Sequence, residues 1–229
     1  MGGFDIAFGV VALGLATAAV EPHFGRDAGR LAGALAFGVG FVFVVVGRSE
    51  LFTENFLVPV TGLGRERESW LKLGELWLGT LVLNIVGGSV IAIVLTSHGV
   101  LSRGTDVALS DVARHLVHYD PGTAFLSALV AGALMTLMTW FVEGAALSIG
   151  VRIAMAWIVG ARVALGAFNH AIVSTVELVF GMRYDAGVST DELLANLGLA
   201  VAGNLVGGLL LVTFARSAQA LGASGDRTS

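Results

Sequence analysis

The sequence predicts an all-α membrane protein whose six transmembrane helices form two inverted three-helix repeats, with breaks in the second and fifth helices. Three observations predict this fold: a composition poor in charge, apolar segments of membrane-spanning length, and a motif that recurs in both halves. Hydrophobic residues make up 55% of the 229-residue chain and charged residues 13%, with a mean hydropathy of +0.84. Soluble domains carry about 25% charged residues, so we expect a polytopic membrane protein.

Charge and cysteine content exclude several other classes. The net charge is −4 and no basic block occurs, so we do not expect nucleic-acid binding. The chain has no cysteine, which excludes a disulfide framework and a thiolate metal site, and we expect no metal or cofactor. The N-terminal segment MGGFDIAFG lacks a basic region and a cleavage motif, so we interpret it as the start of the first span.

Six apolar segments approach the roughly 20 residues that a transmembrane helix needs. Four of them are continuous, and Pro121 is suitably placed in the first turn of the fourth helix. The second span begins at residue 31 and the fifth at residue 153. The continuous spans cover 4–20, 76–96, 122–142 and 193–215, and the polar connections cover 63–75, 97–121 and 181–192.

The second and fifth spans are each interrupted. In the second, an uncharged run is followed by RSELFTEN (48–55), which brings three charges into seven residues, and then by Pro59. In the fifth, Arg162 and the segment VALGAFNH (163–170) separate two apolar runs. Backbone that leaves a helix at membrane depth is tolerated only where protein buries it or water reaches it. We therefore expect the two breaks to border a path across the membrane.

An internal repeat relates the two breaks. The third span contains NIVGG (84–88) and the sixth contains NLVGG (204–208), an offset of 120 residues that carries Glu50 onto His170. Three spans per half is an odd number, so the second half is inverted in the membrane, and paired broken segments indicate a substrate path near the midplane. The alternative is that five-residue matches of Asn, Val and Gly arise by chance in so apolar a chain.

The repeat sets the expected domain organisation. We expect a single transmembrane domain over residues 1–215, with repeat one at about 3–99 and repeat two at about 121–215. A short C-terminal tail, 216–229, follows and is predicted to be disordered.

His170 and Thr53 are the leading candidates for transport chemistry. An anion crosses an apolar constriction only at a cost of several kcal/mol, and a histidine can supply a proton or a hydrogen bond near neutral pH. The alternative is a neutral histidine that only pins the broken helix. Thr53 can donate to an anion or to the imidazole, or else Thr53 or Asn55 caps the half-helix that follows.

The remaining polar and apolar candidates each have a structural alternative. Leu51 and Phe52 either gate the path by excluding water or pack against helices. Asn84 and Asn204 either line the path or make interhelical hydrogen bonds beside small residues. Acids within membranes usually face the interior and pair with bases, so Arg48 and Arg162 are possible partners of the glutamates. The acids are Glu50, Glu54, Glu143 and Glu177, and we expect Glu50 to tie the first break to its neighbouring half-helix.

Four segments in order resemble the formate/nitrite transporter family. SELFTENFLVPV (49–60) resembles that family's E-L-F-T-G-N loop, and FNHAIVSTVELVF (168–180) resembles its second loop, F-E-H followed by a short half-helix. TWFVEGAAL (139–147) resembles its N-W-x-V segment, and GNLVGG (203–208) resembles its sixth helix. The likeness runs from about residue 3 to 215.

The resemblance implies a homopentamer of aquaporin-like protomers in the inner (cell) membrane, with cytoplasmic termini. Each protomer would pass small monovalent anions such as formate, nitrite, lactate or hydrosulfide through its own pore. Carried over residue by residue, Leu51, Phe52 and Thr53 would narrow the pore, and His170 would be the central histidine. Val142 and Val163 would help to form apolar constrictions, and Asn204 falls at the Gly-Asn motif of the sixth helix.

Departures from the family pattern mark a divergent branch. Glu54 replaces a glycine, Asn169 a glutamate, Ser174 an asparagine and Thr139 an asparagine, and Glu143 stands where a small residue is usual. The family often has a lysine ahead of the fourth helix. In this chain the nearest basic groups there are Arg114, His115 and His118.

The leading interpretation is a channel or transporter for small monovalent anions of weak acids, with a proton link through His170 as a hypothesis. The alternative on the same fold is a proton or cation pathway that uses the intramembrane glutamates. A membrane enzyme using His170 and a glutamate is disfavoured, because H-E-x-x-H and G-x-S-x-G are both absent. A non-conducting scaffold is the fourth class. Six Lys and Arg on one side against five on the other do not set the orientation.

Overall fold

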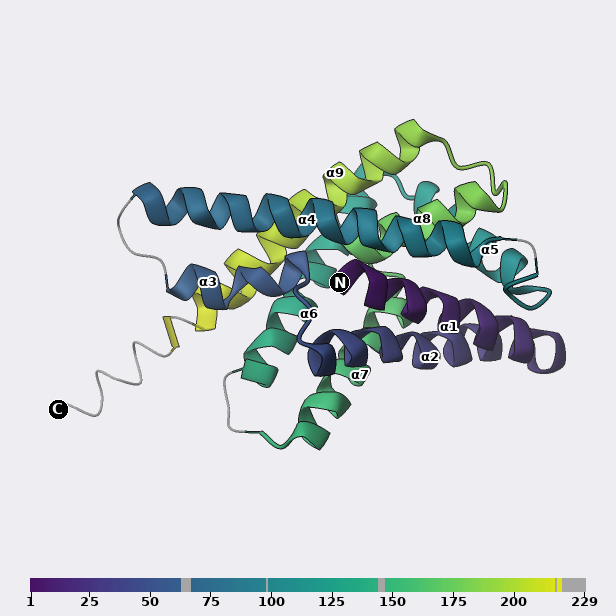
Figure 1. Ribbon diagram of the computed structural model, residues 1–229, viewed down its shortest axis with the longest axis horizontal. Coiled ribbons are helices and arrows are strands. Elements are labelled where there is room, and N and C mark those ends of the chain that lie inside the picture. Colours follow the sequence, from purple (N-terminus) through teal and green to yellow (C-terminus); the bar gives the residue numbers. More distant parts are fainter. Residues whose placement is uncertain (63–66, 98, 144–146, 217, 220–229) are drawn as a thin grey trace.

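In a computed structural model, which describes residues 1–62, 67–97, 99–143, 147–216 and 218–219, every regular element is a helix (Figure 1). The long helices are α1 (Gly2–Phe24), α2 (Arg26–Gly47), α4 (Arg67–Leu95), α6 (Pro121–Glu143) and α9 (Thr190–Val206), which continues as a π-helix (Gly207–Phe214). The shorter elements are the 3₁₀ helix η1 (Phe52–Phe56), α3 (Val58–Thr61), α5 (Thr105–Val117), α7 (Ile149–Leu165) and α8 (Ala171–Arg183).

Five helical stretches among the described residues are long and apolar enough to cross a membrane. They are Gly2–Phe24, Arg26–Gly47, Glu68–Leu95, Pro121–Glu143 and Thr190–Phe214. These stretches contain the predicted first and fourth spans, nearly all of the third and sixth, and the predicted second span up to its break. The predicted fifth span corresponds to α7 and α8, which are 17 and 13 residues long and separated by residues 166–170.

The helices pack around a buried aromatic centre. α1 and α2 lie side by side, joined only by Gly25, whose φ of 85° makes the reversal possible (Figure 1). α2 also packs on α7, and α6 packs on α9. Phe37, Phe41, Phe56 and Phe180 are fully buried where these elements meet. This apolar packing encloses the segments that join the broken helices.

Glycines bring two pairs of helices into backbone contact. A Cβ atom on Gly3 of α1 would lie 1.8 Å from the carbonyl oxygen of Asn84 on α4. In the same way, a Cβ atom on Gly132 of α6 would lie 2.2 Å from the carbonyl oxygen of Asn204 on α9. The asparagine of each repeated motif is therefore pressed against a glycine, which lies on α1 in the first half of the chain and on α6 in the second.

The two breaks have the same backbone geometry but not the predicted register. α2 ends at Arg48 with φ 51°, and Ala167 has φ 47° after the end of α7, so a non-glycine residue turns left-handed in both breaks. These residues are 119 positions apart, whereas the repeated asparagines are 120 apart. The expected match of Glu50 with His170 is therefore off by one residue, and Leu51 takes the position that corresponds to His170.

The π-helix at the end of α9 contacts the first break. The Thr213 hydroxyl donates to the backbone oxygen of Phe56 at 2.8 Å and to that of Gly208 at 3.1 Å. A side chain of the sixth span thus fixes the end of η1, which lies more than 150 residues earlier in the chain.

α5 was not anticipated within the polar connection 97–121. It carries one buried face, which includes Ala108, Leu109, Ala113 and Leu116, and it packs against α8 and α1. The opposite face carries charged side chains. α5 therefore covers the C-terminal end of α8, where Gly181 meets Ala113, rather than crossing the membrane.

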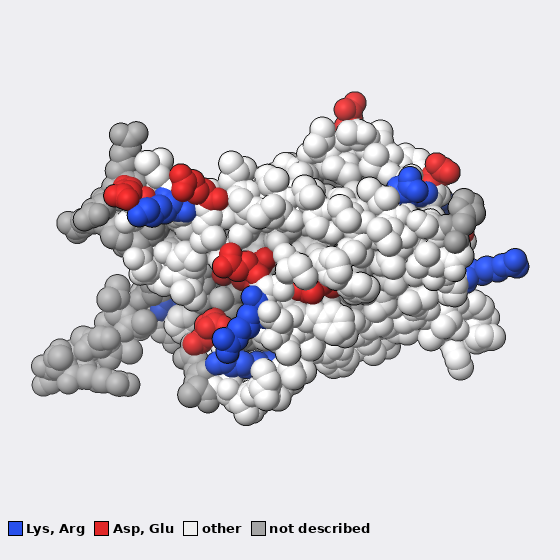
Figure 2. Space-filling model, in the orientation of Figure 1, with Lys and Arg blue, Asp and Glu red and all other residues white. Residues whose placement is uncertain are grey.

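The surface has a broad uncharged region. In Figure 2, charged side chains gather toward the two ends of the molecule and in a patch near the N-terminus, and the surface between them is uncharged. Exposed apolar side chains on α4 include Leu78, Leu83, Val86 and Ile93. Such a surface is suited to lipid or to another subunit.

Some sequence features lie outside the described residues. These are residues 217 and 220–229 of the predicted tail, residues 144–146 of the TWFVEGAAL segment, and residues 63–66 of the second connection.

Candidate functional site

A hydrogen bond between Thr53 and His170 joins the two breaks. Thr53 lies in η1 and His170 immediately precedes α8, and both side chains are fully buried. The distance between Thr53 Oγ1 and His170 Nε2 is 2.8 Å. The two leading candidates from the sequence therefore meet at one point between the halves of the chain.

His170 is also the N-cap of α8, which determines its tautomer. Its Nδ1 accepts hydrogen bonds from the backbone N–H groups of Ile172 (3.3 Å) and Val173 (3.2 Å). A nitrogen that accepts cannot carry a proton, so in the neutral ring the proton is on Nε2. Nε2 then donates to Thr53 Oγ1, and the Thr53 hydroxyl keeps its own proton for another acceptor. Protonating Nδ1 would break both cap bonds.

Apolar side chains surround this pair. Leu51, Phe52, Val142 and Val163 are all at most 5% exposed and belong to the same hydrophobic cluster. The ring of Phe41 stands perpendicular to the His170 ring, with centroids 6.2 Å apart. The predicted constriction residues are thus placed in the apolar core that encloses the two breaks.

The side chain of Asn84 holds the first break through hydrogen bonds to the backbone of that break. Its Oδ1 accepts from Phe52 N–H at 3.0 Å, and its Nδ2 donates to the Glu50 carbonyl at 3.0 Å. One amide therefore satisfies an N–H and a carbonyl two residues apart in a segment that lacks helical hydrogen bonds.

Asn204 holds the second break in the same pattern. Its Oδ1 accepts from Ala171 N–H at 2.9 Å, and its Nδ2 donates to the Asn169 carbonyl at 3.1 Å and the Ala128 carbonyl at 2.8 Å. These bonds match the structural alternative for Asn204, because its polar atoms are directed at backbone groups.

A second amide pair, which the sequence did not indicate, supports the same break. Asn169 Nδ2 donates to Asn196 Oδ1 at 2.8 Å, and Asn196 Nδ2 donates back to Asn169 Oδ1 at 3.1 Å. Asn196 lies eight residues before Asn204 on the same buried face of α9, but it is outside the repeated motif, so the motif did not single it out.

The charged side chains of the first break, and those of Glu143 on α6 and Arg162 on α7, do not form the expected ion pairs with described residues. Arg48, Glu50, Glu143 and Arg162 are exposed, and none of the ion pairs between described residues includes them. Glu50 contributes its backbone oxygen to Asn84 rather than its carboxylate. Hydrogen bonds such as those of Asn84 and Thr213 therefore hold this break in the protomer, rather than ion pairs.

The expected cap of the following half-helix is not formed either. Leu57 precedes α3, and no side chain caps this helix. Asn55 Nδ2 instead makes a long 3.5 Å contact with the Leu51 carbonyl, and its own carbonyl accepts from Trp77 Nε1 at 3.0 Å.

A cavity of about 450 Å³ opens on the α5 side of the breaks. We call it the vestibule. Its wall toward the second break is formed by Val163, Phe168, Val173 and Glu177. Residues of α1, α2 and α5 form most of the rest of the wall. Its charged and histidine lining residues are Glu21, Arg26, Arg30, Asp111, Arg114, His115, His118 and Glu177.

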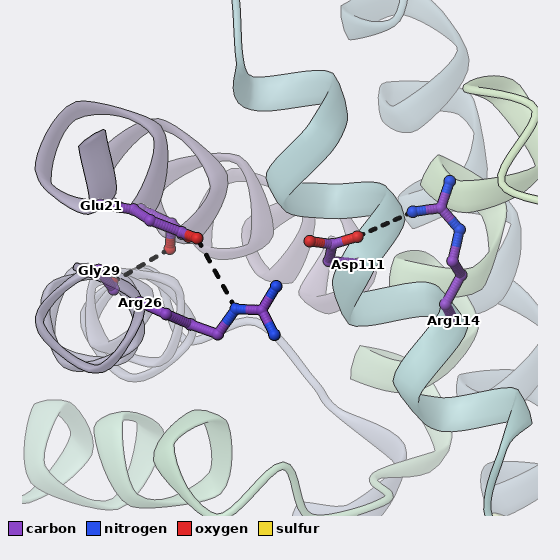
Figure 3. A network of polar contacts seen from close by, with 6 residues as sticks. Glu21, Arg26, Gly29, Asp111 and Arg114 are labelled. Carbon is purple, nitrogen blue, oxygen red and sulfur yellow. Dashed lines mark hydrogen bonds and ion pairs between the residues drawn. The ribbon is translucent and has the colours of Figure 1, made fainter.

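Ion pairs already occupy two of the three arginines of the vestibule (Figure 3). Arg26 Nε lies 3.8 Å from a carboxylate oxygen of Glu21, and Arg114 lies 2.8 Å from Asp111. Arg30 makes no ion pair with any described residue. The basic character of the vestibule therefore rests most directly on Arg30.

Tyr119 connects the vestibule rim to the second break. Its hydroxyl donates to the Ala167 carbonyl at 3.2 Å and lies 3.1 Å from His115 Nε2, which must then be the donor. Burial lowers the pKa of His115, and the charges of Arg30 and His118 lower it further. The left-handed residue of the second break is therefore tied to α5.

Sequence comparison matches nearly the whole chain to one protein-family model. The family model described as "Formate/nitrite transporter" matches residues 1–218. Among curated relatives, the inner membrane protein YfdC of Escherichia coli is 26% identical over 190 residues, which cover 81% of this chain and 59% of YfdC. The formate channel FocA of Haemophilus influenzae is 25% identical over 74% of this chain and 60% of FocA. The chain thus spans about three fifths of the length of these relatives.

Structural comparison shows the fold. A pentameric formate channel with formate bound superposes with a TM-score of 0.79 over 96% of this chain and 94% of that chain, at 22% identity. A structure described as an FNT family ion channel superposes with a TM-score of 0.76 over 96% of this chain and 87% of that chain, at 18% identity.

Proposed function

Because the chain belongs to the formate/nitrite transporter family, we propose that it passes small monovalent anions of weak acids, such as formate or nitrite, across a bilayer. It belongs to a family of channels and transporters, not enzymes. The observation that carries the proposal is the Thr53–His170 hydrogen bond, which places two polar groups at the meeting point of two breaks inside an apolar core.

His170 acts in this proposal as a hydrogen-bond donor rather than as an imidazolium. Its Nδ1 is committed to the cap of α8, so an anion can accept from the Thr53 hydroxyl, and also from Nε2–H if it replaces Thr53 Oγ1 as the acceptor of that bond. Donors that are fixed in an apolar, water-poor site stabilise a negative charge more than they would in water. The proton link through His170 is therefore the weaker form of the hypothesis.

Apolar residues on both sides of the pair form the proposed constrictions. Leu51 and Phe52 precede Thr53, and Val142 and Val163 come from α6 and α7. Apolar rings exclude water from a narrow passage. An anion would shed water here and gain the two donors at the centre.

The proposed assembly is a homopentamer of six-span protomers built from two inverted repeats, about 3–99 and 121–215, in one domain that ends near residue 215. The recurring Asn–glycine contact and the recurring asparagine clamp support the repeat. The pentamer is proposed from the fold shared with a pentameric formate channel. The inner membrane, with cytoplasmic termini, is the proposed location.

A proton or cation pathway is the second candidate function. The buried carboxyl of Glu177 in the wall of the vestibule favours it, as do Glu54 and Glu143 near the first break. Reversal potentials in opposed salt and pH gradients distinguish this pathway from an anion path.

The test is flux into proteoliposomes of purified protein, measured by stopped-flow light scattering with formate, nitrite, lactate, chloride and potassium. We compare His170→Asn, His170→Gln and the wild type. Asparagine is a good N-cap, so H170N keeps an acceptor for α8 but removes the donor toward Thr53. Glutamine keeps a donor at about the reach of Nε2 but caps poorly.

We expect H170N to lose most formate or nitrite flux while remaining folded, and H170Q to retain more flux despite a weaker cap. Wild-type flux in H170N would contradict the assigned role of His170. Uptake of potassium or protons alone by the wild type would overturn the anion proposal in favour of the second candidate.

A further inference from the structure

Glu177 is a buried carboxyl group with no assigned partner in the transport path. Its side chain is 7% exposed, and it makes no hydrogen bond or ion pair with any described residue. It nevertheless lines the vestibule. An ionised carboxyl in this position costs free energy unless it is paired, and groups of this kind within membrane proteins often mark a transport path.

The geometry of α8 aligns Glu177 with the centre of the path. His170, Val173 and Glu177 are spaced three and then four residues apart, so they lie on one face of the helix. Val173 and Glu177 both line the vestibule. An anion that moves inward from the vestibule therefore passes Glu177 before it reaches the His170–Thr53 pair.

The groups around Glu177 do not neutralise it by contact. The vestibule brings Glu21 from α1, Arg26 and Arg30 from α2, and Asp111, Arg114 and His115 from α5 toward the same space, with His118 and Tyr119 beyond α5. Two of the arginines are paired with Glu21 and Asp111. α4 and α9 also pack on α8 but contribute no residue to the lining.

His170 cannot fill the role of a proton carrier without loss of structure. A proton on Nδ1 would displace the N–H groups of Ile172 and Val173 that cap α8. Glu177 has no such commitment, because none of the hydrogen bonds that hold α8 or the second break uses its carboxyl.

We propose that Glu177 is the proton donor of the transport path, and that it makes the channel selective for anions of weak acids. This inference rests on the proposed anion path. The Glu177 O–H bond breaks as an O–H bond forms on the incoming anion, leaving a carboxylate and a neutral acid. The neutral acid still accepts hydrogen bonds from the His170 and Thr53 donors through its oxygen as it passes the centre, and the carboxylate of Glu177 takes a proton from vestibule water. The net movement is one proton with each anion.

The experiment measures formate uptake and internal acidification together in proteoliposomes that contain a trapped pH-sensitive dye. It compares the wild type with Glu177→Gln and Glu177→Asp across a series of external pH values. Glu75→Gln is the matched control, because Glu75 is an exposed carboxyl on α4 outside the vestibule.

We expect E177Q to lose about tenfold or more of the proton-coupled uptake and to flatten its pH dependence, since a positioned proton donor contributes roughly 10²- to 10⁴-fold. E177D should recover part of it, and E75Q should match the wild type. If E177Q folds poorly, the pH dependence of formate uptake by E177D decides the question. A pH dependence identical to that of the wild type overturns the proposal.

Other outcomes separate this inference from the proposed function. An E177Q protein with the wild-type ratio of protons to formate overturns the role of Glu177 alone. Wild-type formate uptake without protons does the same and leaves the anion path intact. No anion uptake by folded wild-type protein overturns both proposals.

Discussion

His170 combines two tasks that a single residue rarely performs together. Its Nδ1 caps the start of α8, and its Nε2 reaches across to the other half of the chain. Replacement by alanine would remove both, so a loss of transport in H170A would not separate chemistry from structure. A cap is worth about 0.5–2 kcal/mol, which is why the asparagine variant is the informative one.

His115 should make the stability of the protein fall in acid. Burial lowers its pKa in the folded protein below the usual value, so the unfolded chain binds the proton more tightly. Stability is therefore highest above the unfolded pKa of about 6.5 and is lost as the pH falls below it. Thermal unfolding in detergent between about pH 7.5 and 5.5 should show a smaller drop for His115→Gln than for the wild type. Equal drops would show that His115 is not responsible.

At the residue scale, the sequence predicted the pairing of Thr53 with His170 because both stand at breaks of the same repeat. It could not predict the tautomer of His170, since that depends on two N–H groups brought to Nδ1 by the start of α8. It also could not identify Asn196, whose partner Asn169 is 27 residues away.

At the element scale, the breaks are held by the helices that carry the repeated asparagines. Asn84 satisfies two backbone groups and Asn204 satisfies three. Each buried polar group left without a partner costs roughly 1–3 kcal/mol. The free-energy cost of removing either asparagine side chain therefore rises with the number of backbone groups that its amide binds.

We expect Asn204→Leu to destabilise the protein more than Asn84→Leu. The reason is the additional bond to Ala128 and the complete burial of Asn204. Unfolding titrations in mixed micelles measure both variants, with Asn204→Asp as a control that keeps only the acceptor. A larger effect in Asn84→Leu would show that the first break, rather than the second, limits stability.

The sequence predicted the apolar spans and both breaks, because charges and a proline interrupt otherwise apolar runs. It missed α5, since a half-polar helix of 13 residues at the membrane surface resembles a polar connection in composition. It placed the repeat correspondence one residue out, because the second half has one residue more than the first between its left-handed turn and its motif asparagine: Ala167 to Asn204 is 37 positions, and Arg48 to Asn84 is 36.

At the scale of the whole molecule, the exposed apolar side chains of α4 and its neighbours need a cover. Lipid covers part of such a surface, and the proposed subunit contacts cover another part. We expect native mass spectrometry of the detergent-solubilised protein to give five copies of the 23.6 kDa chain. A monomer that transports formate would show that the pore does not need the pentamer.

The side-chain hydrogen bonds of Asn84, Asn204 and His170 to the backbone of the breaks have a consequence for motion. The amide hydrogens of Phe52, Ala171, Ile172 and Val173 lie at chain breaks, where backbone usually exchanges quickly with solvent, yet each is held by a side chain. We expect deuterium to enter these positions as slowly as it enters the interiors of α4 and α9. The narrowest part of the proposed path is then a fixed frame, and any opening and closing belongs to the segments around it.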